Sequence, residues 1–443
     1  MFRRLSLALT LVIVAPLYGQ EANPLANWPQ LRGPLATGAS PMGNPPTEWS
    51  ETKNVRWKIE VPGVGSSTPV VWNDKVFLLT AIATDQKVDT VPDPADQPMR
   101  PFGIKFPNRI HQFVVLCLDR GTGKILWQKT AIELLPHEGH HPDNDFASAT
   151  PVTDGQHLWV SFGSRGVFCF DMAGNLNWQQ DFGDLTTRLS FGEGSSPALH
   201  GDTLVTTWDH DGQSFIVAQD AASGEVRWRK DRDEQSAWAT PLIVERAGRT
   251  QVITNATTKV RSYDLATGDV LWECGGQVGN VTPSPVANES LVFCMSGYRG
   301  SALYALPFDQ AGDLTGTDKI AWKHDRGTPY IPSPLLYDHR LYFVQSNDGI
   351  LSCLDAATGK VLIDRTRLPD VRRIYASPVG AAGRVYLTSR DGVTLVIRHG
   401  DTFEVLATNK LDDDIDASAA IAGKELFLRG SKSLYCLAEE GGQ

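Results

Sequence analysis

The sequence has few cysteines, and no two of them are adjacent. Six cysteines are spread over 443 residues, and the first is Cys117. The lack of a Cys-x-x-Cys-His stretch argues against covalently attached haem, and the lack of neighbouring cysteines excludes a disulfide between adjacent residues. We also expect no lipid on a mature N-terminal cysteine, because no cysteine precedes residue 117.

Basic residues are also scarce. The chain has 41 Lys and Arg against 51 Asp and Glu, a net charge of -10. This balance disfavours a broad electrostatic hold on nucleic acid or anionic lipid. No long helical periodicity runs through the chain, which has 40 Gly, 27 Pro and 41% apolar residues. The composition therefore favours one large globular β-protein.

The one long apolar run covers residues 5–17 and follows Arg3 and Arg4. This arrangement is typical of a secretory signal peptide, and the run is too short for a comfortable membrane span. We therefore predict an exported bacterial protein, periplasmic or extracellular, with a signal peptide at about residues 1–20 and no transmembrane segment in the mature chain. Residues 21–53 are expected to form an irregular arm across the rest of the molecule, anchored by Trp28 and Trp49.

A phrase of nine residues, DRGTGKILW from Asp119 to Trp127, recurs through the chain at nearly constant spacing. Its copies start at Asp171, Asp220, Asp264, Asp309 and Asp355, in steps of 52, 49, 44, 45 and 46 residues. The Asp and Gly residues favour a tight turn between two strands. A second phrase, a small hydroxyl residue followed by Pro, precedes each copy and starts at Thr68, Thr150, Ser196, Thr240, Ser284, Ser333 and Ser377, with a degenerate eighth copy at Ser418.

Eight units of four short strands fit this repeat. Four strands in one such unit are typical of a β-propeller blade, whereas solenoids of similar period are helical. The eighth unit lacks its fourth strand, and residues 54–60 closely resemble residues 225–231, which are such a strand. We therefore predict an all-β protein: an eight-bladed β-propeller of four-stranded antiparallel blades over residues 54–438, with an insertion at 84–112 and a short tail at 439–443. The N-terminal strand is expected to close the ring.

Tryptophan and cysteine both recur at fixed places in the repeat. Six of the twelve Trp lie on the outermost strand, and we expect them to pack adjacent blades together rather than bind ligand: Trp57, Trp127, Trp178, Trp228, Trp272 and Trp322. Four cysteines share a place on the third strand and would be too far apart for disulfides: Cys117, Cys169, Cys353 and Cys436. Cys274 and Cys294, in consecutive blades, are the one pair left open.

The D-A-x-T-G-K-x-x-W phrase resembles the tryptophan-docking motif of the pyrroloquinoline-quinone (PQQ) type propellers, which include quinoprotein dehydrogenases and BamB-like proteins. The stretch NWPQLRGP at residues 27–34 resembles an exported branch of this family common in planctomycete-type bacteria. The resemblance implies the fold rather than an activity, because the motif is a packing device. In the quinone dehydrogenases of the family the cofactor lies under a disulfide between adjacent cysteines. Without such a pair, PQQ binding and redox catalysis are disfavoured.

The link at residues 131–147, AIELLPHEGHHPDNDFA, is unusually rich in side chains that can bind metal. It offers His137, Glu138, His140, His141, Asp143 and Asp145 as ligands for zinc or another divalent ion. The alternative is a solvated loop in which these side chains bond to the local backbone. Asp412, Asp413, Asp414 and Asp416 form a second candidate cation site with the same alternative.

Basic and aromatic residues also fall in the links between blades: Arg188, Arg326, Tyr330, Arg372, Arg373 and Tyr375. We expect them around the mouth of the central channel, where they could hold an anionic sugar, a peptide carboxylate or a partner loop. Structural ion pairs are the alternative. We predict a monomeric, non-catalytic binding or scaffold protein that uses this face for a protein partner or a small ligand. The other hypothesis is an enzyme with a metal or quinone at the channel mouth, but no nucleophile, base and orienting residue recur at a recognisable spacing.

Overall fold

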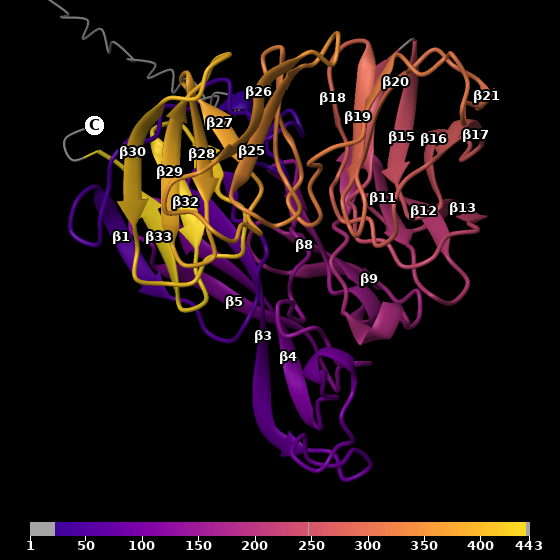
Figure 1. The fold of residues 1–443 in the computed structure, drawn as a ribbon. Coiled ribbons are helices and arrows are strands. Elements are labelled where there is room, and N and C mark those ends of the chain that lie inside the picture. The colour runs from indigo at the N-terminus through magenta and orange to yellow at the C-terminus, as the bar shows by residue number, and fades with distance from the viewer. Residues whose placement is uncertain (1–22, 247, 440–443) are drawn as a thin grey trace, which may run out of the picture.

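The computed structural model describes residues 23–246 and 248–439 and arranges them as eight blades in a ring (Figure 1). This architecture confirms the predicted eight-bladed propeller. The predicted signal peptide lies outside the described residues. Within them, no helix has the length and apolar character needed to cross a membrane.

Blades one to four follow one another along the chain, each with its strands in order from the axis outward. The first consists of β2 (Val70–Trp72), β3 (Lys75–Lys87), β4 (Arg109–Asp119) and β5 (Ile125–Leu134). The second consists of β6 (Val152–Thr153), β7 (His157–Ser161), β8 (Val167–Asp171) and β9 (Leu176–Gln180). The third consists of β10 (Ala198–His200), β11 (Thr203–Trp208), β12 (Phe215–Asp220) and β13 (Val226–Asp231), and the fourth of β14 (Leu242–Arg246), β15 (Arg249–Asn255), β16 (Lys259–Asp264) and β17 (Val270–Gly275).

Blades five to eight repeat the pattern and complete the ring. The fifth consists of β18 (Val286–Ala287), β19 (Leu291–Ser296), β20 (Ala302–Pro307) and β22 (Trp322–His324). The sixth consists of β23 (Leu335–Tyr337), β24 (Arg340–Val344), β25 (Ile350–Asp355) and β26 (Val361–Arg367), and the seventh of β27 (Val379–Ala381), β28 (Arg384–Thr388), β29 (Val393–Arg398) and β30 (Val405–Lys410). The eighth combines β31 (Ala420–Ala422), β32 (Glu425–Arg429) and β33 (Ser433–Leu437) with β1 (Val55–Glu60).

The described part of the chain also contains four short helical turns, one before β1 and three between strands. They are η1 (Pro24–Ala26), η2 (Pro101–Gly103), η3 (Gly163–Arg165) and η4 (Arg188–Ser190). The extended hairpin of β3 and β4 carries η2 and projects from the ring in Figure 1.

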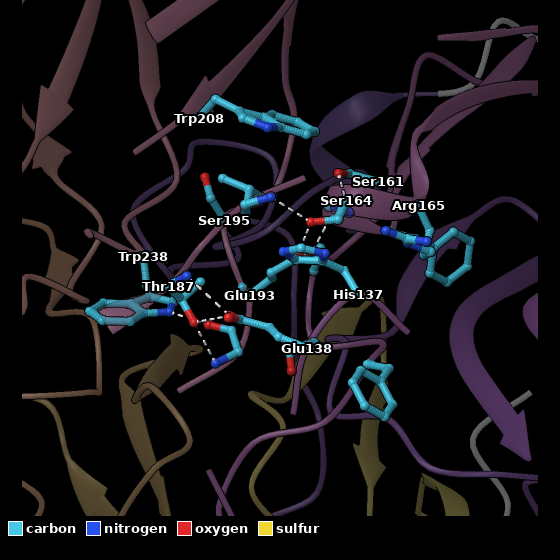
Figure 2. A pocket seen from close by; sticks show the side chains of 18 of the residues that line it. His137, Glu138, Ser161, Ser164, Arg165, Thr187, Glu193, Ser195, Trp208 and Trp238 are labelled. Atoms are coloured by element: carbon cyan, nitrogen blue, oxygen red, sulfur yellow. Dashed lines mark hydrogen bonds between the residues drawn. The ribbon is translucent and has the colours of Figure 1, made fainter. Parts of the chain in front are cut away.

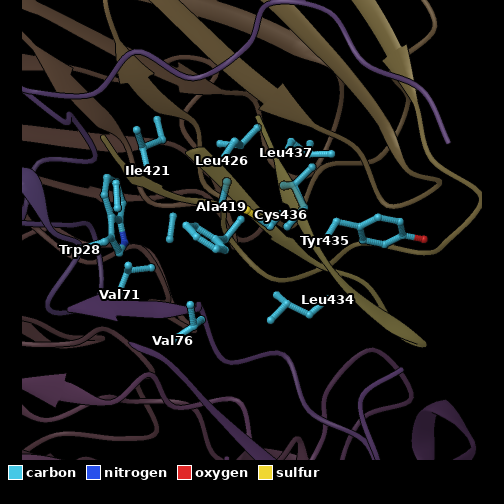
Figure 3. Close-up of a cluster of buried hydrophobic side chains, with 14 of the residues drawn as sticks. Trp28, Val71, Val76, Ala419, Ile421, Leu426, Leu434, Tyr435, Cys436 and Leu437 are labelled. Carbon is cyan, nitrogen blue, oxygen red and sulfur yellow. The ribbon is translucent and has the colours of Figure 1, made fainter. Parts of the chain in front are cut away.

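The N-terminal strand closes the ring as predicted. β1 pairs antiparallel with β33, with Trp57 opposite Cys436 and Glu60 opposite Ser433. Side chains of blades one and eight and of the N-terminal arm form one apolar cluster around this closure (Figure 3). The edge of β33 is therefore paired, and the last blade has the same four-stranded order as the other blades.

A chain of hydrogen bonds joins the blades around the axis. The residue before each Pro of the second phrase donates its backbone N–H to the hydroxyl of the matching residue in the next blade, at 2.8–3.1 Å. The bonds run from Thr68 through Thr150, Ser196, Thr240, Ser284, Ser333 and Ser377 to Ser418. Between blades eight and one, the buried Arg429 instead donates to Ser67 Oγ at 2.8 Å and to Leu79 O at 2.5 Å. We call the eight hydroxyl residues the hydroxyl ring.

The repeated Trp side chains connect neighbouring blades at the outer edge. Trp228 donates its Nε1–H to Leu265 O of the next blade at 2.7 Å, and its ring covers Gly268. Trp57, Trp127, Trp178 and Trp322 make the same bond to Arg120, Met172, Ala221 and Ala356. Trp272 differs: it is fully buried, and its Nε1 has no hydrogen-bond partner in the described structure.

The difference at Trp272 follows from the long turn of the fifth blade. Residues 310–319 cross to the fourth blade, where β21 (Gly312–Asp313) pairs in parallel with Trp272 and Glu273 of β17. The fourth sheet therefore has five strands. Its Trp is covered by the added strand and by Leu314, which is also fully buried.

The arm before β1 packs against the inner ends of several blades. Trp28 is fully buried and exchanges backbone hydrogen bonds with Val71 at 2.9 Å. Arg32 is buried and donates to the carbonyl oxygens of Pro334 and Pro378 at 2.7 and 2.8 Å. Trp49 stacks on Tyr386 with ring centroids 6.3 Å apart.

All six cysteines are buried and unpaired, including Cys274 and Cys294. Burial raises the thiol pKa of Cys117 to about 12 and that of Cys274 to about 11. Such thiols carry little thiolate at neutral pH, so they serve as small apolar core residues.

Candidate functional site

A cavity of about 480 Å³ lies on the propeller axis, inside the hydroxyl ring. All eight ring residues line it, together with Leu31 of the N-terminal arm. Its remaining wall comes from the links between blades, from the β19–β20 connection and from the insertion. We call this space the axial cavity.

Aromatic side chains surround the axial cavity. They are Phe102, His141, Phe191, Trp238, Tyr298, Tyr330 and Tyr375. The rings of Phe102 and Phe191 lie 5.2 Å apart, and each contacts His141 at 5.2–5.4 Å. Tyr298 and Tyr330 form a second pair with centroids 5.0 Å apart. The cavity therefore offers several ring surfaces that are exposed to its interior.

One group of charges at the cavity is internally compensated. Arg390 pairs with Asp143 at 2.6 Å and with Asp416 at 2.7 Å. Arg373 lies 3.4 Å from Asp143, and the Tyr375 hydroxyl donates to the same carboxylate at 2.7 Å. Two arginines and two aspartates thus sum to zero charge, and they fix the orientation of the Tyr375 ring.

Two further arginines have no acidic partner among the described residues: Arg299 lines the cavity, whereas Arg188 lies outside its lining and interacts with Tyr330. Arg299 lies over the Tyr298 ring, 5.2 Å from its centroid. Arg188 is exposed and close enough to Tyr330 to lower the pKa of that phenol, although burial of Tyr330 raises it overall. Arg299 therefore places an unpaired positive charge on the cavity wall, and Arg188 places a second one beside Tyr330.

A smaller pocket of about 60 Å³ opens beside the axial cavity, between the links of blades one to three (Figure 2). Glu193 and Trp238 line both spaces. Glu138 and Glu193 place their carboxyl groups on its wall, where Glu138 accepts from Thr187 N–H at 3.0 Å and Glu193 accepts from Ser164 N–H at 2.8 Å. We call this space the side pocket.

Burial changes the acidity of both glutamates in the side pocket. It raises the pKa of Glu193 to about 7, with a further rise from the charge of Glu138, against the opposing bonds from Ser164. Burial also raises the pKa of Glu138. Near neutral pH, Glu193 therefore exists partly as the neutral acid, which can donate as well as accept a hydrogen bond.

The raised pKa of Glu193 predicts a pH-dependent stability. The folded state binds the proton more tightly than the unfolded state, so the contribution is complete below about pH 4.5 and is lost as pH rises through 7. We expect the stability of the wild type relative to Glu193→Gln to fall by on the order of 2 kcal/mol between pH 4.5 and pH 8. Urea unfolding of both proteins across this range measures the difference. A difference in unfolding free energy between the two proteins that does not change with pH would show that the pKa of Glu193 is not raised.

The residues considered as metal ligands in the 131–147 link do not converge. His137 faces Asp184 at 3.0 Å, His140 is bonded to the carbonyl oxygen of His141, and His141 accepts from the Asp143 backbone N–H at 3.1 Å. Asp145 accepts from Ala147 N–H at 2.7 Å. Within residues 23–246 and 248–439, no three His, Cys, Asp or Glu side chains come together as a metal site.

The Asp412–Asp416 stretch is likewise divided. Asp413 is buried and accepts from Ser433 N–H at 2.9 Å, whereas Asp416 is paired with Arg390. Asp413 and Asp416 are thus bound to different partners and do not share a site.

The proposed channel-mouth residues fall into two groups. Tyr330 and Tyr375 line the axial cavity, Arg373 is bound to Tyr375 at 3.1 Å, and Arg188 lies near Tyr330. Arg326 and Arg372 are exposed and are not part of the cavity wall.

Sequence reasoning missed Glu193, Trp238 and Arg299. Each lies in a link or connection rather than in the repeated phrases, so the repeat alignment gives it no equivalent in other blades. A usable signal was present in the stretch FGEGSS at 191–196, where Glu193 stands between glycines directly before the hydroxyl ring residue Ser196. An acidic residue at that place in the unit has no counterpart in the other links.

Comparison with known proteins places the chain in a family. A family model described as outer membrane protein assembly factor BamB matches residues 111–364, more than half of the chain. Similar solved structures include BamB from Moraxella catarrhalis (17% identity, 66% of this chain and 96% of that chain, TM-score 0.43). No curated protein sequence matches the chain.

Two further solved structures are similar in fold. The computationally designed Ika8 protein has 16% identity over 76% of this chain and 95% of that chain, with a TM-score of 0.53. Quinohemoprotein alcohol dehydrogenase from Comamonas testosteroni has 13% identity over 95% of this chain and 81% of that chain, with a TM-score of 0.47. The likeness to the designed protein concerns the fold alone.

The residues around the axial cavity do not fit a PQQ cofactor as the dehydrogenases of the family hold it. None of the cavity-lining residues is a cysteine, and all six cysteines are buried within the blades. The axial cavity therefore has no disulfide between adjacent cysteines that could cover a quinone.

Proposed function

The chain belongs to the BamB-like family of PQQ-type β-propellers, and from that premise we propose that it is an exported, non-catalytic binding protein. Its ligand site is the axial cavity, and its ligand is an anion that carries a ring. The observation that carries this proposal is the combination of aromatic side chains lining one cavity with two uncompensated arginines, Arg299 on the cavity wall and Arg188 beside Tyr330.

The cavity has a size and composition that suit a ligand of one or two rings. Its volume of about 480 Å³ falls within the range of small-molecule sites. The faces of Trp238, Tyr298 and Tyr330 offer stacking surfaces, and the guanidinium groups of Arg188 and Arg299 can bind a carboxylate. The group around Asp143 is compensated, and the raised pKa of Glu193, about 7, reduces the negative charge of that carboxyl group, so the two arginines favour an anionic ligand.

The hydroxyl groups nearest the axis support binding rather than catalysis. In seven of the eight hydroxyl ring residues the oxygen accepts a backbone N–H from the preceding blade. Among the described residues these hydroxyl groups are not seen to donate to a base, and a serine or threonine needs such a base to act as a nucleophile. The ring thus serves to hold the blades at a fixed radius around the ligand.

Titration with 2-naphthoate, a planar ring with one carboxylate, tests this proposal. We expect binding by the wild type, and about 10-fold weaker binding for Arg299→Ala and for Arg188→Ala, since each removes one charge-assisted hydrogen bond. Arg326→Ala is the matched control, because Arg326 is an exposed arginine of another link and lies outside the cavity wall, whereas Arg188 interacts with the cavity residue Tyr330. The neutral analogue 2-naphthalenemethanol should bind more weakly than the acid.

Calorimetric titration of the wild type and the three arginine variants with 2-naphthoate and with 2-naphthalenemethanol measures these affinities. Equal affinities for the acid and the alcohol, or an effect of Arg326→Ala as large as that of Arg299→Ala, would contradict the cavity as an anion site. Binding only of a protein partner that is unaffected by the cavity variants would move the functional surface elsewhere on the propeller.

A further inference from the structure

We infer that the ligand of the axial cavity is a sugar acid whose hydroxyl groups enter the side pocket. This inference rests on the proposed function and names the chemical class of its ligand. It is carried by an observation that the proposed function does not use, the set of polar atoms in the side pocket that have no partner.

Three residues that line the side pocket each carry a buried polar atom without a hydrogen-bond partner in the described structure. These atoms are Trp208 Nε1, Thr206 Oγ1 and Arg165 Nε. Trp208 and Thr206 are only 2% and 3% exposed. Buried polar groups are nearly always hydrogen-bonded, so three unpaired groups around one small space indicate that it normally contains a polar occupant.

The charges of the side pocket select the kind of occupant. Glu138 and Glu193 disfavour an anion, while the raised pKa of both carboxyl groups weakens their attraction for a cation, and the charge of Arg165 is already paired with Asp184. The wall presents donors at Trp208 and Arg165 and acceptors at the two carboxyl groups. A hydroxyl group matches this set, because it can donate to a carboxyl oxygen and accept from an indole N–H at the same time.

The volumes determine which part of a sugar enters. The side pocket, at about 60 Å³, is smaller than the roughly 150 Å³ cavity that holds a benzene ring. A sugar ring must therefore stay in the axial cavity, with one or two hydroxyl groups extending past Glu193. Trp238 lines both spaces, and its Nε1–H is fixed by a 2.6 Å bond to Gly192 O, so its ring is held in place for stacking.

The axial cavity and the side pocket together fit a uronic acid, or a glycan that ends in a uronic acid. Hydroxyl groups fill the side pocket, the ring packs against Trp238, and the carboxylate binds Arg299 on the cavity wall and Arg188 beside Tyr330. A neutral sugar would leave both arginines unpaired, and an aromatic acid would leave the polar atoms of the side pocket unpaired. Each of these incomplete ligands is expected to bind more weakly than the sugar acid.

Calorimetry with digalacturonate, with the neutral disaccharide lactose and with 2-naphthoate tests this assignment. We expect digalacturonate to bind at least about 10-fold more tightly than either other compound, as one well-placed set of hydrogen bonds allows. Trp208→Phe and Thr206→Val each remove an unpaired polar atom and nearly preserve shape. Neither residue lines the axial cavity.

These variants should weaken digalacturonate binding about 10-fold and leave 2-naphthoate binding unchanged. That split supports a hydroxyl subsite. Unchanged digalacturonate binding in both variants overturns the inference, since the pocket would then contain only water. Binding of 2-naphthoate without any binding of digalacturonate also overturns it and leaves the proposed function intact. Failure of all three compounds to bind contradicts the proposed function as well.

Discussion

Deletion of residues 55–60 is expected to convert the protein from a monodisperse species into one that aggregates. These residues form β1, whose loss leaves the edge of β33 unpaired and exposed. It also removes Trp57, which bonds to Arg120 O at 2.9 Å and covers Gly123 of the first blade. Because loss of one buried Trp alone costs about 3–5 kcal/mol, we expect a loss of more than about 5 kcal/mol in unfolding free energy.

Light scattering and thermal unfolding of the truncated protein measure this effect. A synthetic peptide of residues 50–64 provides the control, because it can restore the missing strand without altering the rest of the chain. Recovery of a monodisperse protein with the peptide would assign the defect to the open edge. A truncated protein with an unchanged Tm and no aggregation would contradict closure of the ring by β1.

The second large effect is expected for Trp228→Ala. The Trp228 indole joins the third and fourth blades through its bond to Leu265 O and its contact with Gly268. We expect a loss of about 3 kcal/mol, at the lower end of the range for aromatic truncation, because Trp228 is only partly buried. Val226→Ala on the same strand is the control, since Val226 is 49% exposed and should change stability by less than about 0.5 kcal/mol.

Two glycine variants test the packing of Trp228 without changing the tryptophan itself. Gly268 and Gly248 share a φ of +71°, but a Cβ on Gly268 would lie 2.6 Å from Trp228 Cε3, whereas nothing lies within 4 Å of one on Gly248. Both changes to Ala strain the backbone equally, so the excess loss for Gly268→Ala measures the contact with the indole. Urea unfolding that gives equal losses for the two variants would contradict a packing role for Trp228.

The repeat made most of the fold predictable from the sequence. Turn residues and alternating apolar residues recur in each unit, so eight weak signals reinforce one another. The strand that leaves the repeat could not be predicted in this way: β21 is only two residues long, and its pairing with β17 depends on the path of one long turn. The Ser and Thr before each Pro were visible as a pattern, but their bonds around the axis required the geometry of the closed ring.

The candidate site was predictable only in part. Tyr330 and Tyr375 could be placed near the axis because links between blades converge there, whereas Arg326 and Arg372, in the same links, point elsewhere on the surface. The His-rich link offered suitable metal ligands by composition, yet its side chains bond to local partners in different directions. Direction of a side chain in an irregular link depends on long-range contacts that residue type and spacing do not encode.

A crystal structure of the protein grown with digalacturonate tests the central claim, that the axial cavity is the functional site. We predict electron density for the sugar ring beside Trp238, with its carboxylate at Arg188 and Arg299 and its hydroxyl groups directed past Glu193. Density for the sugar at the 310–319 turn or at another part of the surface, with water alone in the axial cavity, would contradict the account.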